Sequence, residues 1–295
     1  MSSSTEHEGS GPRPCLICGA RGAKPLHGPR SSLYRCSCGQ VFVDPIPSGD
    51  EIAQREDDAF AGGLMDETAE MFTAYYRDFP EDPVVLGFRA TLERLHQLTG
   101  GGRLVDVGIG TGLLLHLGKE AGFDVLGCEI SPGAAAKATE EFGVEVQVGD
   151  FLEAEFSVAP SVITMADVLE HTHDPRIFLE HALGTLKPGG ALFVAVPNHR
   201  STLFGMADIL ARLPVVGSLA ERLYVPNHYW YFTPATLRRL AEDVGFEVSE
   251  VRGDTPYLGR YSFSFPIRAG LAVLFAIGKW TGLEGRVEIY ARKPA

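Results

Sequence analysis

The sequence predicts an α/β fold: a Rossmann-like, doubly wound, seven-stranded and mostly parallel sheet with a helical lid and a small N-terminal module. Three observations predict it. After residue 100, seven short runs rich in β-branched residues alternate mostly with helix-length segments. The first of these runs leads into a glycine-rich turn and a leucine-rich helix start. Four of the five cysteines fall in the first 40 residues, outside the alternating region.

The pattern divides the chain into four segments. Residues 1–14 form a polar tail that we expect to be disordered, and residues 15–48 hold the cysteines. Residues 49–99 have a helical pattern that ends at Gly100 to Gly102, and residues 100–295 carry the strand and helix alternation. An extra helical piece at about 200–230 follows a strand, where insertions often cover a ligand. The seven expected strands are RLVDV, DVLGCEI, VEVQVGD, VITMADV, ALFVAVPN, FEVSEVR and VEIYARK.

Composition and charge exclude several classes of protein. The chain has 295 residues, 45% of them hydrophobic, which fits a globular protein. The 38 acidic and 26 basic residues give a net charge of −12, which does not favour binding to nucleic acid. No apolar run is long enough for a membrane span, and the N-terminus lacks the apolar core of a signal peptide. We therefore expect a cytoplasmic protein.

The clustered cysteines predict a metal site. A CxxC pair is followed by a CxC pair, and four thiolates can surround one tetrahedral Zn²⁺ in a reducing cytosol. The alternative is a set of reduced structural cysteines, and His27 could replace a poor ligand. Cys128 stands alone in an apolar run and is expected in the core. The predicted metal ligands are Cys15, Cys18, Cys36 and Cys38.

The glycine-rich turn predicts a nucleotide-like ligand. It follows a strand and precedes a helix, and Glu129 lies at the end of the next strand, where a carboxylate can hold both ribose hydroxyls. A dinucleotide fingerprint needs glycine or alanine at position 113, but Leu113 stands there. The run is DxGxGxG, and its acidic residue suits a ligand with an ammonium and a sulfonium group better than a pyrophosphate.

From about residue 85 to 295 the chain resembles the class I S-adenosylmethionine-dependent methyltransferases. LVDVGIGTG, CEIS, VGDF, ADVLEHTHDP and LKPGGALFVAVPN resemble blocks of the small-molecule and sugar-modifying branch. The N-terminal CLICG…YRCSCGQVFVDPIPS resembles a zinc ribbon attached to some of these enzymes, although its second pair is CxC where CxxCG is usual. The resemblance implies S-adenosylmethionine as cofactor and structural zinc. It implies cofactor contacts at Asp106, Gly108, Gly110, Gly112, Glu129, Ile130, Asp150, Phe151, Ala166 and Asp167.

The resemblance implies that Asp106 lies near the cofactor's amino group and that Glu129 accepts hydrogen bonds from the ribose hydroxyls. Asp150 accepts from the adenine amine, and Phe151 packs on the adenine ring. Each residue also has a structural alternative: Asp150 could cap a helix, and Glu129 could be a solvated strand end.

Two histidines are candidate catalytic bases. His171 follows the fourth strand, and His228 precedes the aromatic run Tyr229 to Phe232. His171 could instead shape its loop, and His228 could cap the helix that begins near Thr233. Because four consecutive aromatic residues cannot all face inward from one element, we expect some of them to line a pocket.

The interpretation is methyl transfer to a small metabolite, with oxygen favoured as the methylated atom. One alternative is a zinc-ribbon RNA methyltransferase; another is a non-catalytic scaffold that binds the cofactor. The segment Phe265 to Leu283 is expected to be a buried helix or a dimer surface in a possible homodimer, with contact to a membrane as the alternative.

Overall fold

The computed structural model describes residues 11–26, 31–61, 81–211, 224–260 and 264–295. The predicted tail up to residue 10, His27 and the middle of the predicted insertion lie outside these ranges. Among the described residues, none of the helices combines the length and apolarity needed to cross a bilayer.

All seven predicted strands occur, and they form one sheet. In chain order they are β4 (Arg103–Val107), β5 (Asp124–Glu129), β6 (Val146–Val148), β7 (Val162–Ala166), β8 (Ala191–Pro197), β10 (Glu247–Asp254) and β11 (Arg286–Arg292). The order across the sheet is β10-β11-β8-β7-β4-β5-β6. Strands β8, β7, β4, β5 and β6 pair in parallel, and β11 runs antiparallel to both of its neighbours. The fold prediction is therefore confirmed.

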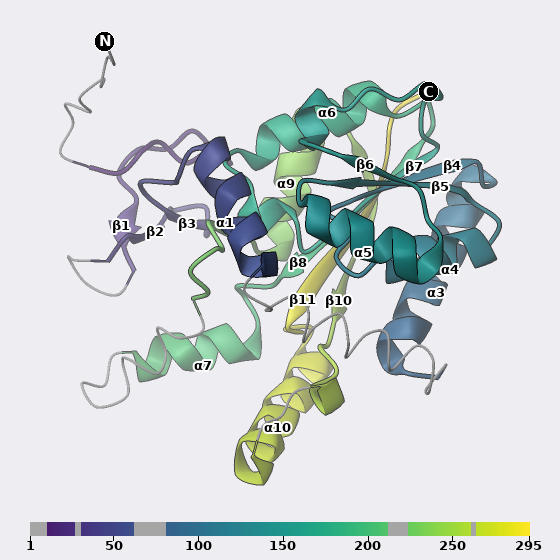
Figure 1. Ribbon diagram of the computed structural model, residues 1–295. Helices are drawn as coiled ribbons and strands as arrows, with labels where there is room; N and C mark the ends of the chain where they lie inside the picture. Colours follow the sequence, from purple (N-terminus) through teal and green to yellow (C-terminus); the bar gives the residue numbers. More distant parts are fainter. Residues whose placement is uncertain (1–10, 27–30, 62–80, 212–223, 261–263) are drawn as a thin grey trace.

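Helices cover both faces of this sheet (Figure 1). The helices of the described residues are α1 (Gly49–Ala61), α3 (Pro83–Thr99), α4 (Leu113–Glu120), α5 (Pro132–Phe142), α6 (Pro175–Thr185), α7 (Thr202–Leu210), α9 (Pro234–Val244) and α10 (Phe265–Thr281), with short 3-10 turns η1 (Phe151–Glu153), η2 (Leu169–His171) and η3 (Leu258–Arg260). Residues of α3, α4 and α5 form one apolar core, and residues of α6 and α9 belong to the other. Helix α3 ends where predicted, because Gly100 adopts a left-handed φ of 73° and caps it.

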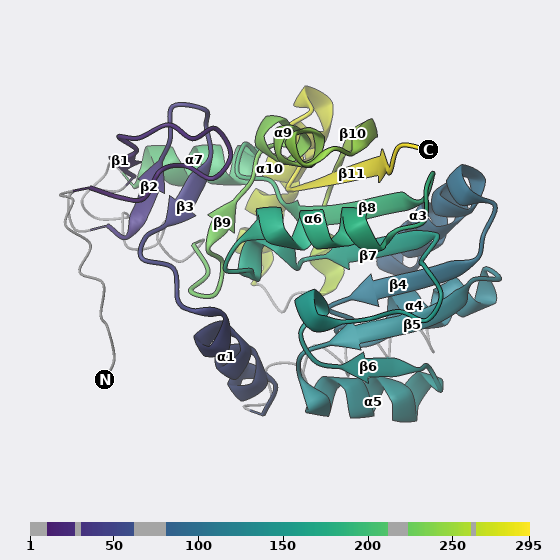
Figure 2. The same ribbon diagram turned by 90° about the horizontal axis from the view of Figure 1, so that it is seen from above.

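The cysteine module shares a second sheet with the main domain. Strands β1 (Lys24–Pro25), β2 (Leu33–Arg35) and β3 (Val41–Val43) continue into β9 (Trp230–Tyr231), which lies far along the chain. Val41 pairs with Tyr231, and Phe42 pairs with Trp230. Cys15, Ile17 and Phe42 also belong to the apolar core formed with α6 and α9. The module is thus packed into the fold, beside the sheet edge where α1 stands (Figure 2).

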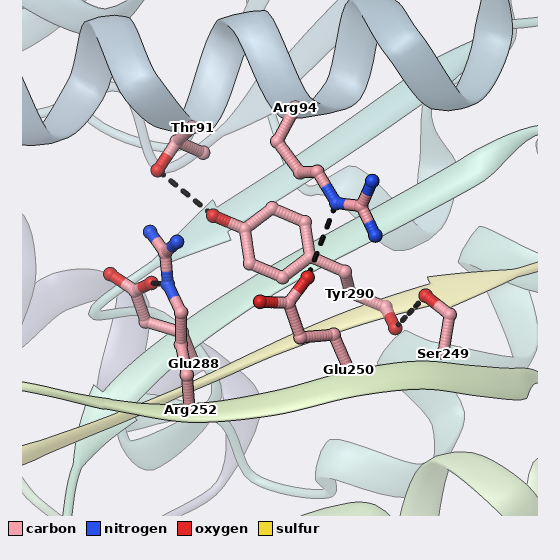
Figure 3. Close-up of polar contacts among 7 residues, drawn as sticks. All are labelled: Thr91, Arg94, Ser249, Glu250, Arg252, Glu288 and Tyr290. Atoms are coloured by element: carbon pink, nitrogen blue, oxygen red, sulfur yellow. Dashed lines mark hydrogen bonds and ion pairs between the residues drawn. The ribbon is translucent and has the colours of Figure 1, made fainter.

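Polar contacts attach α3 to the antiparallel strands β10 and β11 (Figure 3). The hydroxyls of Thr91 and Tyr290 lie 3.1 Å apart in the core. The Arg252 guanidinium lies 5.2 Å from the centre of the Tyr290 ring, and Arg94 donates to Glu250 at 3.2 Å. The contact between Thr91 and Tyr290 pairs two buried hydroxyls, whereas Arg94, Glu250 and Arg252 are partly exposed.

Trp230 should contribute strongly to stability. It is 1% exposed, stacks on Phe42 with ring centroids 6.0 Å apart, and its indole donates to the Thr172 carbonyl at 2.8 Å. We expect Trp230→Ala to lower the free energy of unfolding by about 3–5 kcal/mol and Trp230→Phe by about 1–3 kcal/mol, because the carbonyl loses its donor. Urea denaturation measures both. The matched control is Trp280→Phe, at 88% exposure, which should change stability by less than about 0.5 kcal/mol; an equal loss in both variants would contradict the assignment.

Candidate functional site

The glycine turn after β4 is shaped by steric limits. Gly108, Gly110 and Gly112 all have positive φ, at 68°, 52° and 79°. A Cβ on Gly108 would come within 2.7 Å of Val168, and one on Gly112 within 2.8 Å of Ala138. A Cβ on Gly110 would meet no atom within 4 Å, so this position faces open space. The turn is fixed by its neighbours and lets a ligand approach the backbone at Gly110.

Asp106 lies just before this turn, in β4. It is 3% exposed and accepts a hydrogen bond of 2.6 Å from the Thr164 hydroxyl. Burial raises the pKa of Asp106 to about 7, although the bond from Thr164 opposes the shift. The carboxyl group is therefore close to half-protonated at neutral pH, and a nearby cation would favour its charged form.

Glu129 ends β5 beside the turn. One of its carboxylate oxygens accepts from the Ser131 amide at 2.9 Å, and burial raises the pKa of Glu129. Ser131 in turn donates its hydroxyl to Asp57 of α1 at 3.1 Å. Ile130 lies between them and is 37% exposed. Helix α1 thus reaches the carboxyl ends of the parallel strands. Figure 2 shows α1 at the ends to which the arrows of β4 and β5 point.

In the loop after β6, Asp150 makes a capping contact and Phe151 is buried. Asp150 accepts from the Leu152 amide at 2.9 Å and caps η1, as its structural alternative proposed. Phe151 is 2% exposed, and its ring packs against Phe178 and His181. The Phe151 ring therefore lies in the core and offers no open face for packing on a ligand.

Asp167 directly follows β7, whose last residue is the half-buried Ala166. Its φ is 58°, a left-handed conformation that aspartate tolerates better than most residues. Its carboxylate lies 2.6 Å from the Arg286 guanidinium of β11. This ion pair joins β11 to the loop that begins at Asp167 and contains η2.

The two predicted histidines lie together. The rings of His171, in η2, and His228 are 4.6 Å apart between centroids, with an interplanar angle of 81°. Glu56 of α1 places a carboxylate oxygen 3.5 Å from Nδ1 of His171 and also accepts from Asn227. Glu170 is fully buried beside them, and neither of its carboxylate oxygens has a partner in the described structure.

The charges around the two rings separate their pKa values. Burial alone would lower the pKa of His171, but the contact with Glu56 and the nearby Glu170 and Asp167 raise it above its usual value. Burial and the neighbouring His171 lower the pKa of His228 to about 4. His171 therefore binds a proton more readily than His228, which stays neutral at neutral pH. Sequence reasoning missed Glu56, because a single acidic residue in a polar helix gives no signal of the ring it meets in space.

The aromatic run Tyr229 to Phe232 differs from the expectation that some of its rings line a pocket. All four side chains are at most 2% exposed, so none lines an open pocket. Three pack into the core shared with the cysteine module, and Tyr231 packs into a smaller cluster on the other side. A strand between two apolar layers can bury consecutive residues on both faces, which the prediction did not consider.

The four N-terminal cysteines converge as the metal prediction requires. The Sγ atoms of Cys15 and Cys38 are 3.8 Å apart, and those of Cys18 and Cys36 are 3.4 Å apart. All four lie within 4.8 Å of one another. A tetrahedron of thiolates at the usual Zn–S distance has edges of about 3.8 Å, so the set fits zinc. Cys128 is 2% exposed, as predicted for a core residue.

A second group of possible metal ligands lies at the histidine pair. Glu170, His171 and His228 each offer one ligand atom, and these atoms lie within 4.8 Å of one another. Burial and the nearby Asp167 raise the pKa of Glu170, whereas the neighbouring His171 opposes this shift.

Comparison with known proteins shows the family. A family model described as "Methyltransferase domain" matches residues 86–251, more than half of the chain. The ubiquinone biosynthesis O-methyltransferase of Azorhizobium caulinodans is 30% identical over 185 residues, covering 59% of this chain and 70% of that protein. The protein of the same name from Xanthomonas axonopodis pv. citri is 30% identical over 162 residues, covering 52% of this chain and 66% of that protein.

Solved structures agree in fold. A SAM-dependent methyltransferase from Archaeoglobus fulgidus superposes with a TM-score of 0.50 at 20% identity, covering 74% of this chain and 100% of that one. Phosphoethanolamine N-methyltransferase 2 of Haemonchus contortus, solved with S-adenosyl-L-methionine, gives a TM-score of 0.55 at 18% identity, covering 86% of this chain and 62% of that one.

The cysteine geometry predicts one zinc ion per chain. We expect Cys15→Ser/Cys18→Ser to lose it, because two of the four thiolates are removed. Elemental analysis of the purified protein measures the metal, and Cys128→Ala is the control that should retain it. A double variant that keeps a full equivalent of zinc would refute this ligand set.

Proposed function

The chain belongs to the methyltransferase-domain family and is an S-adenosylmethionine-dependent methyltransferase, and we propose that it methylates a hydroxyl oxygen of a small-molecule acceptor. The observation that carries the choice of oxygen is the Glu56–His171 pair at the end of β7, whose electrostatics suit a base. The similarity to O-methyltransferases of ubiquinone biosynthesis supports the same acceptor atom.

The residues around the glycine turn would hold the cofactor. Gly110 faces open space, and Asp106 and Glu129 place carboxylates at the ends of β4 and β5. Asp106 would face the ammonium group and Glu129 the ribose hydroxyls, while Ile130 would offer an apolar surface. When bound, S-adenosylmethionine supplies a methyl group on a positively charged sulfur, which is an electrophile.

The catalytic task of the chain is to position a nucleophile and to remove its proton. In-line methyl transfer depends mainly on holding the acceptor oxygen against the methyl carbon. Neutral His171 would accept the hydroxyl proton as the new carbon–oxygen bond forms and the bond between the methyl carbon and sulfur breaks, with its electron pair left on sulfur. Glu56 would then stabilise the resulting imidazolium, and neutral His228 would orient the ring from its edge. Glu56 is thus a positioning residue.

The alternative of an RNA substrate has weaker support. The N-terminal module contains several arginines, but Arg13 is paired with Asp44 at 2.8 Å and Arg35 with Asp208 at 2.6 Å. These ion pairs reduce the positive charge that a phosphate backbone would meet. A non-catalytic scaffold would not need the contact between Glu56 and His171, which suits a catalytic base.

Cofactor binding should depend on pH through Asp106. The free carboxyl group has a pKa of about 7, and a bound ammonium favours its charged form, so affinity should fall as pH drops below 7. Calorimetric titration with S-adenosylmethionine between pH 5.5 and 8.5 tests this, with about tenfold lost per pH unit at the acid end. Asp106→Asn should bind more weakly with a flat profile. A variant that keeps wild-type affinity and pH dependence would remove Asp106 from the site.

The base assignment can be tested before the acceptor is known. Glu56→Gln removes the nearest negative charge and should lower the pKa of His171, which NMR of the imidazole resonances can follow, with His171→Asn to assign the signal. Once a panel of hydroxylated compounds yields an acceptor, the acid limb of kcat/KM should move to lower pH in Glu56→Gln. His171→Asn should reduce kcat by about 10²–10⁴-fold with little change in cofactor affinity. A His171 variant with wild-type turnover would return this residue to a structural role.

A further inference from the structure

Helix α10 leaves most of its apolar residues in solvent. Phe265 is 84% exposed, Val273 60% and Trp280 88%. This overturns the expectation of a buried helix. Val273, Ile277 and Trp280 are spaced so that they share one helical face, and Phe265 and Ile267 extend the apolar surface at the first turn.

The opposite face of α10 is packed, so its orientation is fixed. Phe275 and Gly278 are the residues of this helix that are buried. The Thr202 hydroxyl of α7 donates to the Leu274 carbonyl at 2.8 Å, and a Cβ on Gly278 would lie 3.1 Å from the same hydroxyl oxygen. Close packing against α7 therefore turns the stripe of Val273, Ile277 and Trp280 outward.

The charge of this segment is opposite to that of the chain. Between Asp254 and Glu284 the sequence contains Arg260, Arg268 and Lys279 and no acidic residue, in a chain of net charge −12. Lys279 is exposed next to Trp280. A basic and apolar helix surface with aromatic residues near both ends matches the interface of an anionic bilayer.

We propose that the exposed face of α10 docks on an anionic lipid surface. A second copy of the chain fits this face less well, because two such segments would oppose like charges. The helix lies along the lipid surface and does not cross it, in accord with the absence of a spanning helix among the described residues. Both α7 and α10 follow strands at their carboxyl ends and stand beyond that edge of the sheet (Figure 1). Docking therefore brings the lipid surface to the edge that also carries Gly110 and His171.

Trp280 provides a direct readout of docking. The chain has two tryptophans, and the other, Trp230, is 1% exposed. Full-length protein should sediment with vesicles of phosphatidylglycerol and phosphatidylcholine, and sediment less with phosphatidylcholine alone or at high salt. Tryptophan emission should shift to the blue on binding, and brominated lipid should quench it. Val273→Ser/Trp280→Ser should weaken partitioning by about tenfold or more, whereas Trp280→Phe should retain most of it.

The matched control is Val158→Ser, which changes an apolar side chain of 54% exposure in the loop before β7. It should partition like the wild type. The proposal is overturned if the wild type binds neither kind of vesicle. It is also overturned if Val158→Ser loses as much binding as Val273→Ser/Trp280→Ser. It is also overturned if sedimentation equilibrium shows a dimer that the double variant dissolves while vesicles leave the emission unchanged. Cofactor titration of the double variant, expected to match the wild type, separates this result from any failure of the proposed function.

Discussion

The arrangement of the site depends on the hydrogen bonds that hold Tyr229, next to β9, between two other segments. The Tyr229 carbonyl accepts from the Val43 amide at 2.9 Å, and its amide donates to the Glu170 carbonyl at 2.7 Å. One residue thereby connects the cysteine module to η2. The loop after β3 leads directly from the module into α1, which contains Glu56. The position of Glu56 therefore also depends on where Tyr229 holds the module. Folding of the module and the geometry of the histidine pair are therefore coupled, which would give the proposed zinc site a role in positioning the proposed base.

Burying charged carboxyl groups at this edge of the sheet costs free energy, and such a cost indicates that the groups have a function. Burial raises the pKa of Asp106, Glu129 and Glu170, so each is less stable as an anion than it would be in water. Shifted carboxyl groups gathered at the ends of parallel strands are typical of a functional site. A ligand with a positive charge would restore the charged forms, which agrees with a cofactor that carries ammonium and sulfonium groups.

Local patterns predicted most of the fold. Seven β-branched runs, the glycine turn and the paired cysteines depend on neighbours in sequence, and each appears where expected. Contacts between distant segments were not predictable from such patterns. Glu56 meets His171 because α1 crosses the sheet edge, and Phe151 turns into the core because Phe178 of α6 lies above it. The burial of Tyr231 likewise depends on its pairing with Val41.

The apolar helix shows why composition alone could not decide the role of a segment. An apolar sequence such as that of α10 would serve equally well in a core, and only the partner available decides which residues are covered. Here α7 supplies one narrow contact, and the remaining apolar side chains, Trp280 among them, stay outside it. Net charge is similarly an average: a chain of −12 can gather its acids at the cofactor site and its local positive charge on α10. The two surfaces lie at one edge of the sheet, so docking would place the lipid surface on the same side of the sheet as the proposed base.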